Sequence, residues 1–266
     1  GGAVGTLIAD WPGLRQPQHV VVEQLLDVLC ISPLAPPAVL EVARRAHATP
    51  YPPHWTEEVD AASGALYFYH ELRDEASWQH PLVDTFKEVL DLIASLVAEH
   101  ATLGNLAQRI EQELADVQRR AAEELAEWIG PLPAESHDSG SDSGVYFYNR
   151  RTGQSEWEDP RERWRFDLQV RYELLVGFLV AEERAVAAHF GSDAFRRPEH
   201  YHDVTPTLTS LASTMSSVTS MLSHSLTSPG DAVRESGSGG SACSGEDVET
   251  QWARPRPVRR SGLPLP

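Results

Sequence analysis

The chain carries one arrangement of aromatic residues twice, and these side chains can stack on a ligand and donate hydrogen bonds to it. Each copy has a tyrosine, a tryptophan eleven residues later and a proline three residues after the tryptophan. The copies are Tyr67, Trp78 and Pro81, and Tyr146, Trp157 and Pro160. Tyrosine and tryptophan rings present flat apolar faces, while their O–H and N–H groups donate hydrogen bonds. These residue types indicate noncovalent recognition rather than catalysis.

The tyrosine of each copy opens an aromatic triplet that is typical of a β-strand. Side chains alternate across a strand, so Tyr67 and Tyr69 share one face while Phe68 points to the other. The second triplet has the same division, with Tyr146 and Tyr148 on one face and Phe147 on the other. One face can therefore bind a ligand while the other closes a small apolar core.

This combination resembles the WW domain, a three-stranded antiparallel sheet that binds proline-rich peptides. In the first copy the resemblance implies a groove in which Tyr67 and Trp78 hold a ligand proline and Tyr69 extends the surface. It also implies an apolar buckle on the other face, formed by Pro52, Trp55, Phe68 and Pro81. A polyproline II ligand is prefolded and loses little entropy on docking. We expect dissociation constants of micromolar to tens of micromolar, or roughly 7–8 kcal/mol.

The second copy matches the same pattern but differs from the first copy in the residues of its groove and buckle. Its implied groove consists of Tyr146, Tyr148, Arg150, Ser155 and Trp157. Its implied buckle consists of Leu132, Pro133, Phe147 and Pro160. The WW family has a Ser or Thr at the position of Ser155, which donates to a ligand carbonyl, and the first copy has Ala76 there. The second copy is therefore expected to be the better equipped for binding.

The core of the second copy is predicted to be incomplete. Alignment on Leu132 and Pro133 places Ser136 where the first copy has Trp55, and Trp128 lies too far upstream unless a bulge intervenes. Losing a buried tryptophan costs roughly 3–5 kcal/mol, which a module of about 30 residues can hardly absorb. We expect the flanking helices to complete this core.

The sequence predicts an α+β chain of two small three-stranded antiparallel sheets, joined and flanked by amphipathic, partly coiled-coil helices. Apolar residues at heptad spacing, as in Phe86, Leu90 and Ile93, favour pairing of these helices within or between chains. The predicted segments are a flexible N-terminus (1–19), a helical hairpin (20–49), the first WW copy (50–82), a long heptad helix with a possible break at 104–105 (83–130), the second WW copy (131–161), an amphipathic helix (162–195) and a disordered low-complexity tail (196–266).

Composition excludes several classes of function. The net charge of −17 disfavours nucleic acid and anionic membranes as partners. No apolar run approaches the ~20 residues of a membrane span. The two cysteines, Cys30 and Cys243, are far apart, which favours a reducing cytoplasmic compartment without disulfide or zinc. Because no catalytic motif is present, we expect neither an enzyme nor a cofactor or metal.

Two further patterns concern partners. Residues 20–93 resemble the N-terminal module of a family of large centrosomal proteins of centriolar distal appendages, which implies a place at the centriole or ciliary base. The tail segment 254–266 contains arginine–proline and leucine–proline repeats that resemble WW ligands, so it is a candidate intramolecular ligand. Two interpretations stay open: an adaptor for proline-rich segments, and a structural coiled-coil scaffold whose WW sheets are degenerate. Peptide binding separates them.

Overall fold

The computed structural model describes residues 8, 11–134, 144–190, 213 and 226. The predicted disordered tail, including segment 254–266, lies outside the described residues apart from Ser213 and Leu226. The described elements in chain order are α1 (Val22–Val28), α2 (Pro37–His47), β1 (Trp55–Val59), β2 (Leu66–His70), β3 (Glu75–Ser77), α3 (Val83–Ala98), α4 (Leu103–Leu125), β4 (Trp128–Pro133), β5 (Val145–Asn149), β6 (Ser155–Glu156) and α5 (Pro160–Phe190).

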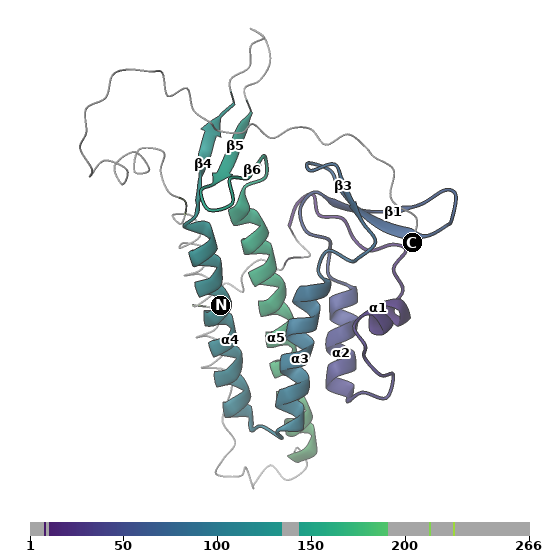
Figure 1. Ribbon diagram of the computed structural model, residues 1–266. Coiled ribbons are helices and arrows are strands. Elements are labelled where there is room, and N and C mark those ends of the chain that lie inside the picture. Colours follow the sequence, from purple (N-terminus) through teal and green to yellow (C-terminus); the bar gives the residue numbers. More distant parts are fainter. Residues whose placement is uncertain (1–7, 9–10, 135–143, 191–212, 214–225, 227–266) are drawn as a thin grey trace, which may run out of the picture.

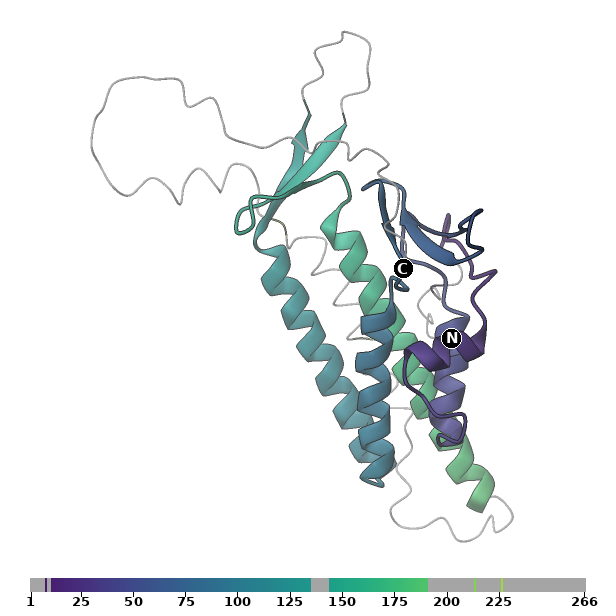
Figure 2. The same ribbon diagram turned by 45° about the vertical axis from the view of Figure 1, so that its right-hand side comes forward.

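The prediction of an α+β chain with two three-stranded antiparallel sheets is confirmed. The sheets have the simple orders β1-β2-β3 and β4-β5-β6. Both sheets lie at the same end of a helical bundle (Figures 1 and 2). Helix α5 packs against α2, α3 and α4. Apolar residues occur around most of its circumference, as a helix inside a bundle requires; the buried ones are Phe166, Leu168, Val170, Leu174, Leu175, Phe178 and Leu179.

The predicted helix over 83–130 is wrong, because the chain forms two helices there. Helix α3 ends at Ala98, and His100 adopts a positive φ of 48°. The Thr102 side chain then accepts from the backbone N–H of Asn105 at 3.3 Å and caps the start of α4. The chain reverses at residues 99–102, and Asn105 belongs to the first turn of α4 rather than to the break. The heptad residues of α4 therefore pack within the chain.

The described residues of the predicted flexible arm 1–19, which are Ile8 and 11–19, contact the rest of the fold. Ile8 is 2% exposed and belongs to the core of the helical bundle. The ring of Trp11 meets Phe166 of α5 edge-on, with 6.0 Å between ring centroids. The backbone N–H of Tyr51 donates to the carbonyl of Arg15 at 2.8 Å. These contacts attach Ile8 and Trp11 to the bundle, and Arg15 to the entry of the first sheet.

The first sheet rests on the helices through a cluster of rings. His80 lies 5.1 Å from Phe68, 5.4 Å from Tyr51 and 5.4 Å from Phe86, measured between ring centroids. Its Nδ1 accepts from the backbone N–H of Leu82 at 3.1 Å. Burial lowers the pKa of His80 to about 4. The ring is therefore neutral in the folded protein at physiological pH.

A stability loss on mild acidification follows from this buried histidine. In the unfolded chain His80 takes up a proton near its ordinary value of 6.5, whereas the folded protein resists protonation down to about 4. The stabilisation that neutral His80 provides is complete above pH 6.5 and is lost as the pH falls to 4. The free energy of unfolding then decreases by about 3 kcal/mol in total. Urea titrations at several pH values should show that His80→Phe flattens this dependence. The exposed control His100→Phe should leave the slope unchanged, and an equal slope in both variants would contradict the assignment.

Candidate ligand-binding grooves

The outer face of the first sheet carries the predicted Tyr67–Trp78 pair. The two ring centroids are 6.0 Å apart and the ring planes meet at 70°. Both side chains are half-buried. Tyr69 shares this face opposite Ala76, and its hydroxyl donates to Asp74 Oδ1 at 2.6 Å. The structure therefore brings together the three residues that the sequence assigned to this groove.

The outer face of the second sheet repeats the arrangement. The ring centroids of Tyr146 and Trp157 are 6.2 Å apart and their planes meet at 74°. Trp157 is 41% exposed. Tyr148 pairs with Ser155 across β5 and β6, as predicted for a shared groove. Arg150 lies in the turn that follows, and its Nη2 donates to the carbonyl of Ala126 at 2.9 Å.

Trp128, and not Ser136, takes the core position of the second sheet, so the prediction of a missing tryptophan is wrong. Trp128 pairs with Asn149, just as Trp55 pairs with His70 in the first sheet. The indole is 3% exposed, within a cluster contributed by α4, α5 and Phe147. The second module therefore begins before residue 131.

A bulge in β4 makes this register possible. The pairing with β5 shifts between Ile129 and Leu132. A Cβ on Gly130 would lie 2.5 Å from Cδ1 of Phe147, so only glycine allows the Phe147 ring to cover the strand here. Leu132 and Pro133 lie farther along the strand than predicted, and Pro133 is exposed rather than part of a buckle. The apolar core of the second sheet is supplied by Trp128 and the helices instead.

The inner face of the first sheet also departs from the predicted buckle. Phe68 packs against Tyr51, which is fully buried and which the sequence analysis did not single out. Pro52, Trp55 and Pro81 are half-buried and line a cavity of about 380 Å³ between the sheet and the helices. In the sequence, the position of Tyr51 directly before Pro52-Pro53 could have indicated that it belongs to this inner face. Its hydroxyl donates to Glu57 at 2.7 Å, and burial raises its pKa.

The residues that end the second strand of each sheet close the following turn in the same way. Asn149 Oδ1 accepts from the backbone N–H groups of Arg151 and Thr152, each at 3.0 Å. His70 Nδ1 accepts from the backbone N–H of Arg73 at 3.2 Å. Because Nδ1 is the acceptor, the hydrogen of a neutral His70 ring resides on Nε2. That nitrogen lies 3.3 Å from Glu158 Oε2.

An ion-pair network joins the two sheets through Glu158, which directly follows the groove residue Trp157. Arg73 Nη2 lies 2.8 Å from Glu158 and 3.3 Å from Glu156. Glu158 is 5% exposed. Burial alone would raise its pKa, but the contact with His70 and the positive charge of Arg73 hold the pKa below its ordinary value. Sequence reasoning missed this network, whose partners are 85 residues apart. It connects the end of the second strand of the first sheet to the third strand of the second sheet and the residues after it.

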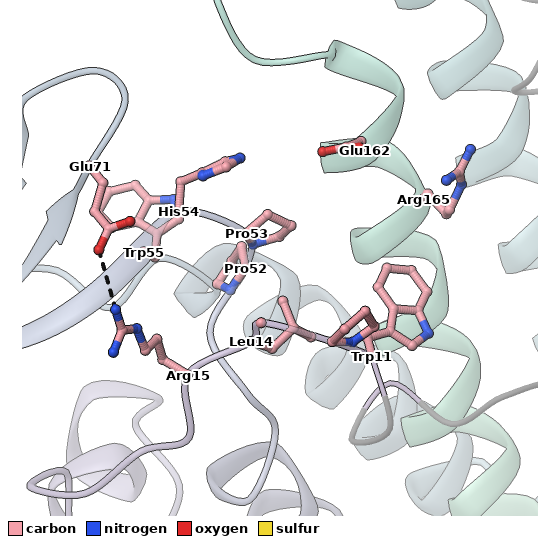
Figure 3. Close-up of a pocket in the computed structure, with 12 residues that line it drawn as sticks. Trp11, Leu14, Arg15, Pro52, Pro53, His54, Trp55, Glu71, Glu162 and Arg165 are labelled. Atoms are coloured by element: carbon pink, nitrogen blue, oxygen red, sulfur yellow. Dashed lines mark ion pairs between the residues drawn. The ribbon is translucent and has the colours of Figure 1, made fainter.

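A separate pocket lies at the entry to the first sheet (Figure 3). Its volume is about 380 Å³, and Trp11, Leu14, Pro53 and Trp55 contribute apolar walls. Arg15 and Glu71 form an ion pair of 3.6 Å at its edge. The Tyr67–Trp78 pair does not line this pocket.

The described part of the chain offers no group of three or more His, Cys, Asp or Glu side chains that could hold a metal ion. A search of the same residues finds no helix with the length and apolar character needed to cross a membrane. Comparison of the chain with family models, curated protein sequences and solved structures found no match.

Proposed function

We propose that this chain is a noncatalytic adaptor that binds proline-rich peptide segments through two WW-type grooves. The observation that carries the proposal is the repeated tyrosine–tryptophan pair. In both sheets the rings meet on the outer face at nearly the same separation and angle, 6.0 Å and 70° in one and 6.2 Å and 74° in the other. A structural core would place such rings inward, where Phe68 and Phe147 are 4% exposed.

The chemistry of these rings suits a proline-rich ligand. Proline rings stack on tyrosine and tryptophan, and the ligand's carbonyls remain available as acceptors because polyproline II has no internal hydrogen bonds. The second groove is the main site, since it combines Tyr146, Ser155 and Trp157. The Ser155 hydroxyl supplies the donor that Ala76 cannot supply in the first groove. A cytoplasmic adaptor at the centriole or ciliary base follows as the proposed setting from the resemblance of residues 20–93.

A structural scaffold with sheets that do not bind peptides is the second candidate. The Tyr69 hydroxyl is engaged by Asp74 at 2.6 Å, which stabilises the sheet itself. The edge-to-face contact within each aromatic pair also stabilises a sheet without any ligand. In this case self-association through helices would be the chain's activity.

Substitution of the two groove tryptophans tests the proposal. With a fluorescein-labelled decaproline peptide, Trp157→Ala is expected to weaken binding more than about tenfold, a loss of at least ~1.4 kcal/mol. Trp78→Ala should weaken it less. Fluorescence anisotropy titrations of the full chain measure both.

A matched pair of substitutions measures the contribution of the serine hydroxyl to peptide binding. Ser155→Ala should weaken binding roughly three- to tenfold, the range of one hydrogen bond. Ala76→Ser should strengthen binding at the first groove. A larger loss from Trp78→Ala than from Trp157→Ala would reverse the ranking of the grooves. Absence of binding by the unsubstituted chain would leave the scaffold interpretation.

A further inference from the structure

The two grooves differ in charge at the positions that border their aromatic pairs. Strand pairing and sequence alignment on the aromatic triplets identify two equivalent positions on the groove face at which the first module has a carboxylate and the second does not. Glu58 is equivalent to Leu132, and Asp74, which accepts from the Tyr69 hydroxyl, is equivalent to Gly153. The first groove is therefore the more acidic of the two.

The Glu58 carboxylate is accessible to a ligand. Glu58 is exposed, and it makes no ion pair with another residue of the described structure. Glu58 lies directly opposite Tyr67 in the strand pairing. A cationic ligand segment can therefore approach the Tyr67–Trp78 pair without first breaking a buried ion pair.

We propose that the first groove holds residues 254–260 of this chain's own tail, Arg-Pro-Arg-Pro-Val-Arg-Arg, and that the second groove is thereby left for an external ligand. The proposal rests on the proposed function. The segment combines two prolines for the aromatic pair with four arginines for the acidic border. Guanidinium groups form strong charge-assisted hydrogen bonds with carboxylates. The second groove has Leu132 and Gly153 at the positions of Glu58 and Asp74, so it offers the arginines no carboxylate there.

The tether is short enough for this contact. Residues 254–260 lie outside the described structure, but Leu226 packs against the cluster that contains Trp128 and Phe147. Twenty-seven residues lie between Leu226 and Arg254. A chain of this length can extend to about 90 Å at most. The two modules touch directly, with Arg73 and Glu158 2.8 Å apart, so the two grooves belong to neighbouring sheets. Short tethers give effective concentrations near millimolar.

The experiment uses a fluorescein-labelled peptide of residues 252–262 and the full chain at low salt. The reference protein, termed here the tail-reversed chain, carries Arg254→Glu, Arg256→Glu, Arg259→Glu and Arg260→Glu. The peptide should bind the tail-reversed chain at least about tenfold more tightly than the native chain, because the native tail competes from the same molecule. Added salt should reduce the affinity, since exposed charges provide part of the attraction.

Groove variants in the tail-reversed chain locate the site. Glu58→Lys or Trp78→Ala should each weaken peptide binding at least about tenfold. Leu132→Lys, the matched exchange at the second groove, and Trp157→Ala should each change it less than twofold. A peptide with alanine in place of both prolines should bind at least tenfold more weakly, which separates groove binding from attraction to the acidic chain.

Three results would overturn the inference: equal peptide affinity for the native and tail-reversed chains, loss of binding through Trp157→Ala instead of Trp78→Ala, or full binding by the alanine peptide. Decaproline titration of the same proteins distinguishes the two proposals. If decaproline binds and the tail peptide does not, only the tail assignment fails. If neither peptide binds, the proposed function fails with it.

Discussion

Replacing Trp128 by alanine is expected to destabilise the protein by about 3–5 kcal/mol, because the change removes a large side chain from a packed core. Trp128 is 3% exposed, and the residues around it come from three elements, with Leu125 from α4, Phe147 from β5 and Leu168 from α5. These residues cannot close the space without moving strands and helices together. Denaturation by urea, followed by tryptophan fluorescence and circular dichroism, measures the loss.

Trp157→Ala is the matched control for Trp128→Ala. It removes the same side chain from the same module, but Trp157 is 41% exposed. Its effect on the free energy of unfolding should stay within about 1 kcal/mol. The two variants thus separate a folding role from a binding role within one sheet. Equal stability losses would contradict the assignment of Trp128 to the core.

Leu114→Asp is expected to cost more than about 4 kcal/mol and to prevent stable folding of the helical bundle. Leu114 is fully buried on α4 within the main apolar core. The exchange removes a buried leucine, worth about 2–5 kcal/mol, and adds the cost of placing a carboxyl group without a partner. Loss of the cooperative thermal transition would report the effect.

Ala115→Asp controls for charge and helix propensity, since Ala115 follows Leu114 on the same helix and is exposed. It should leave the transition within about 1 kcal/mol of the native chain. Sedimentation of the native chain addresses the predicted self-association. A monomer is expected if the heptad residues of α4 serve only the contacts within the chain. An unchanged thermal transition of the Leu114→Asp variant would show that the heptad residues of α4 do not stabilise the bundle.

The aromatic grooves could be predicted from the sequence because their geometry is local. Alternation along a strand places Tyr146 and Tyr148 on one face whatever surrounds the sheet. A short hairpin then brings Ser155 opposite Tyr148 and Trp157 beside Tyr146. The same reasoning applies to Tyr67 and Trp78. Within such short loops, spacing along the chain already decides which side chains meet.

The tertiary structure decided the rest, because the deciding contacts join distant residues. A heptad pattern persists across the break at residues 99–102, so it cannot reveal that α4 folds back beside α5. Trp128 reaches its place only through the bulge beside Gly130 and the space left by Phe147. The partly buried contact between Arg73 and Glu158 joins residues 85 positions apart. Periodicity indicates which face of an element is apolar, but which other element covers that face depends on packing across the whole chain.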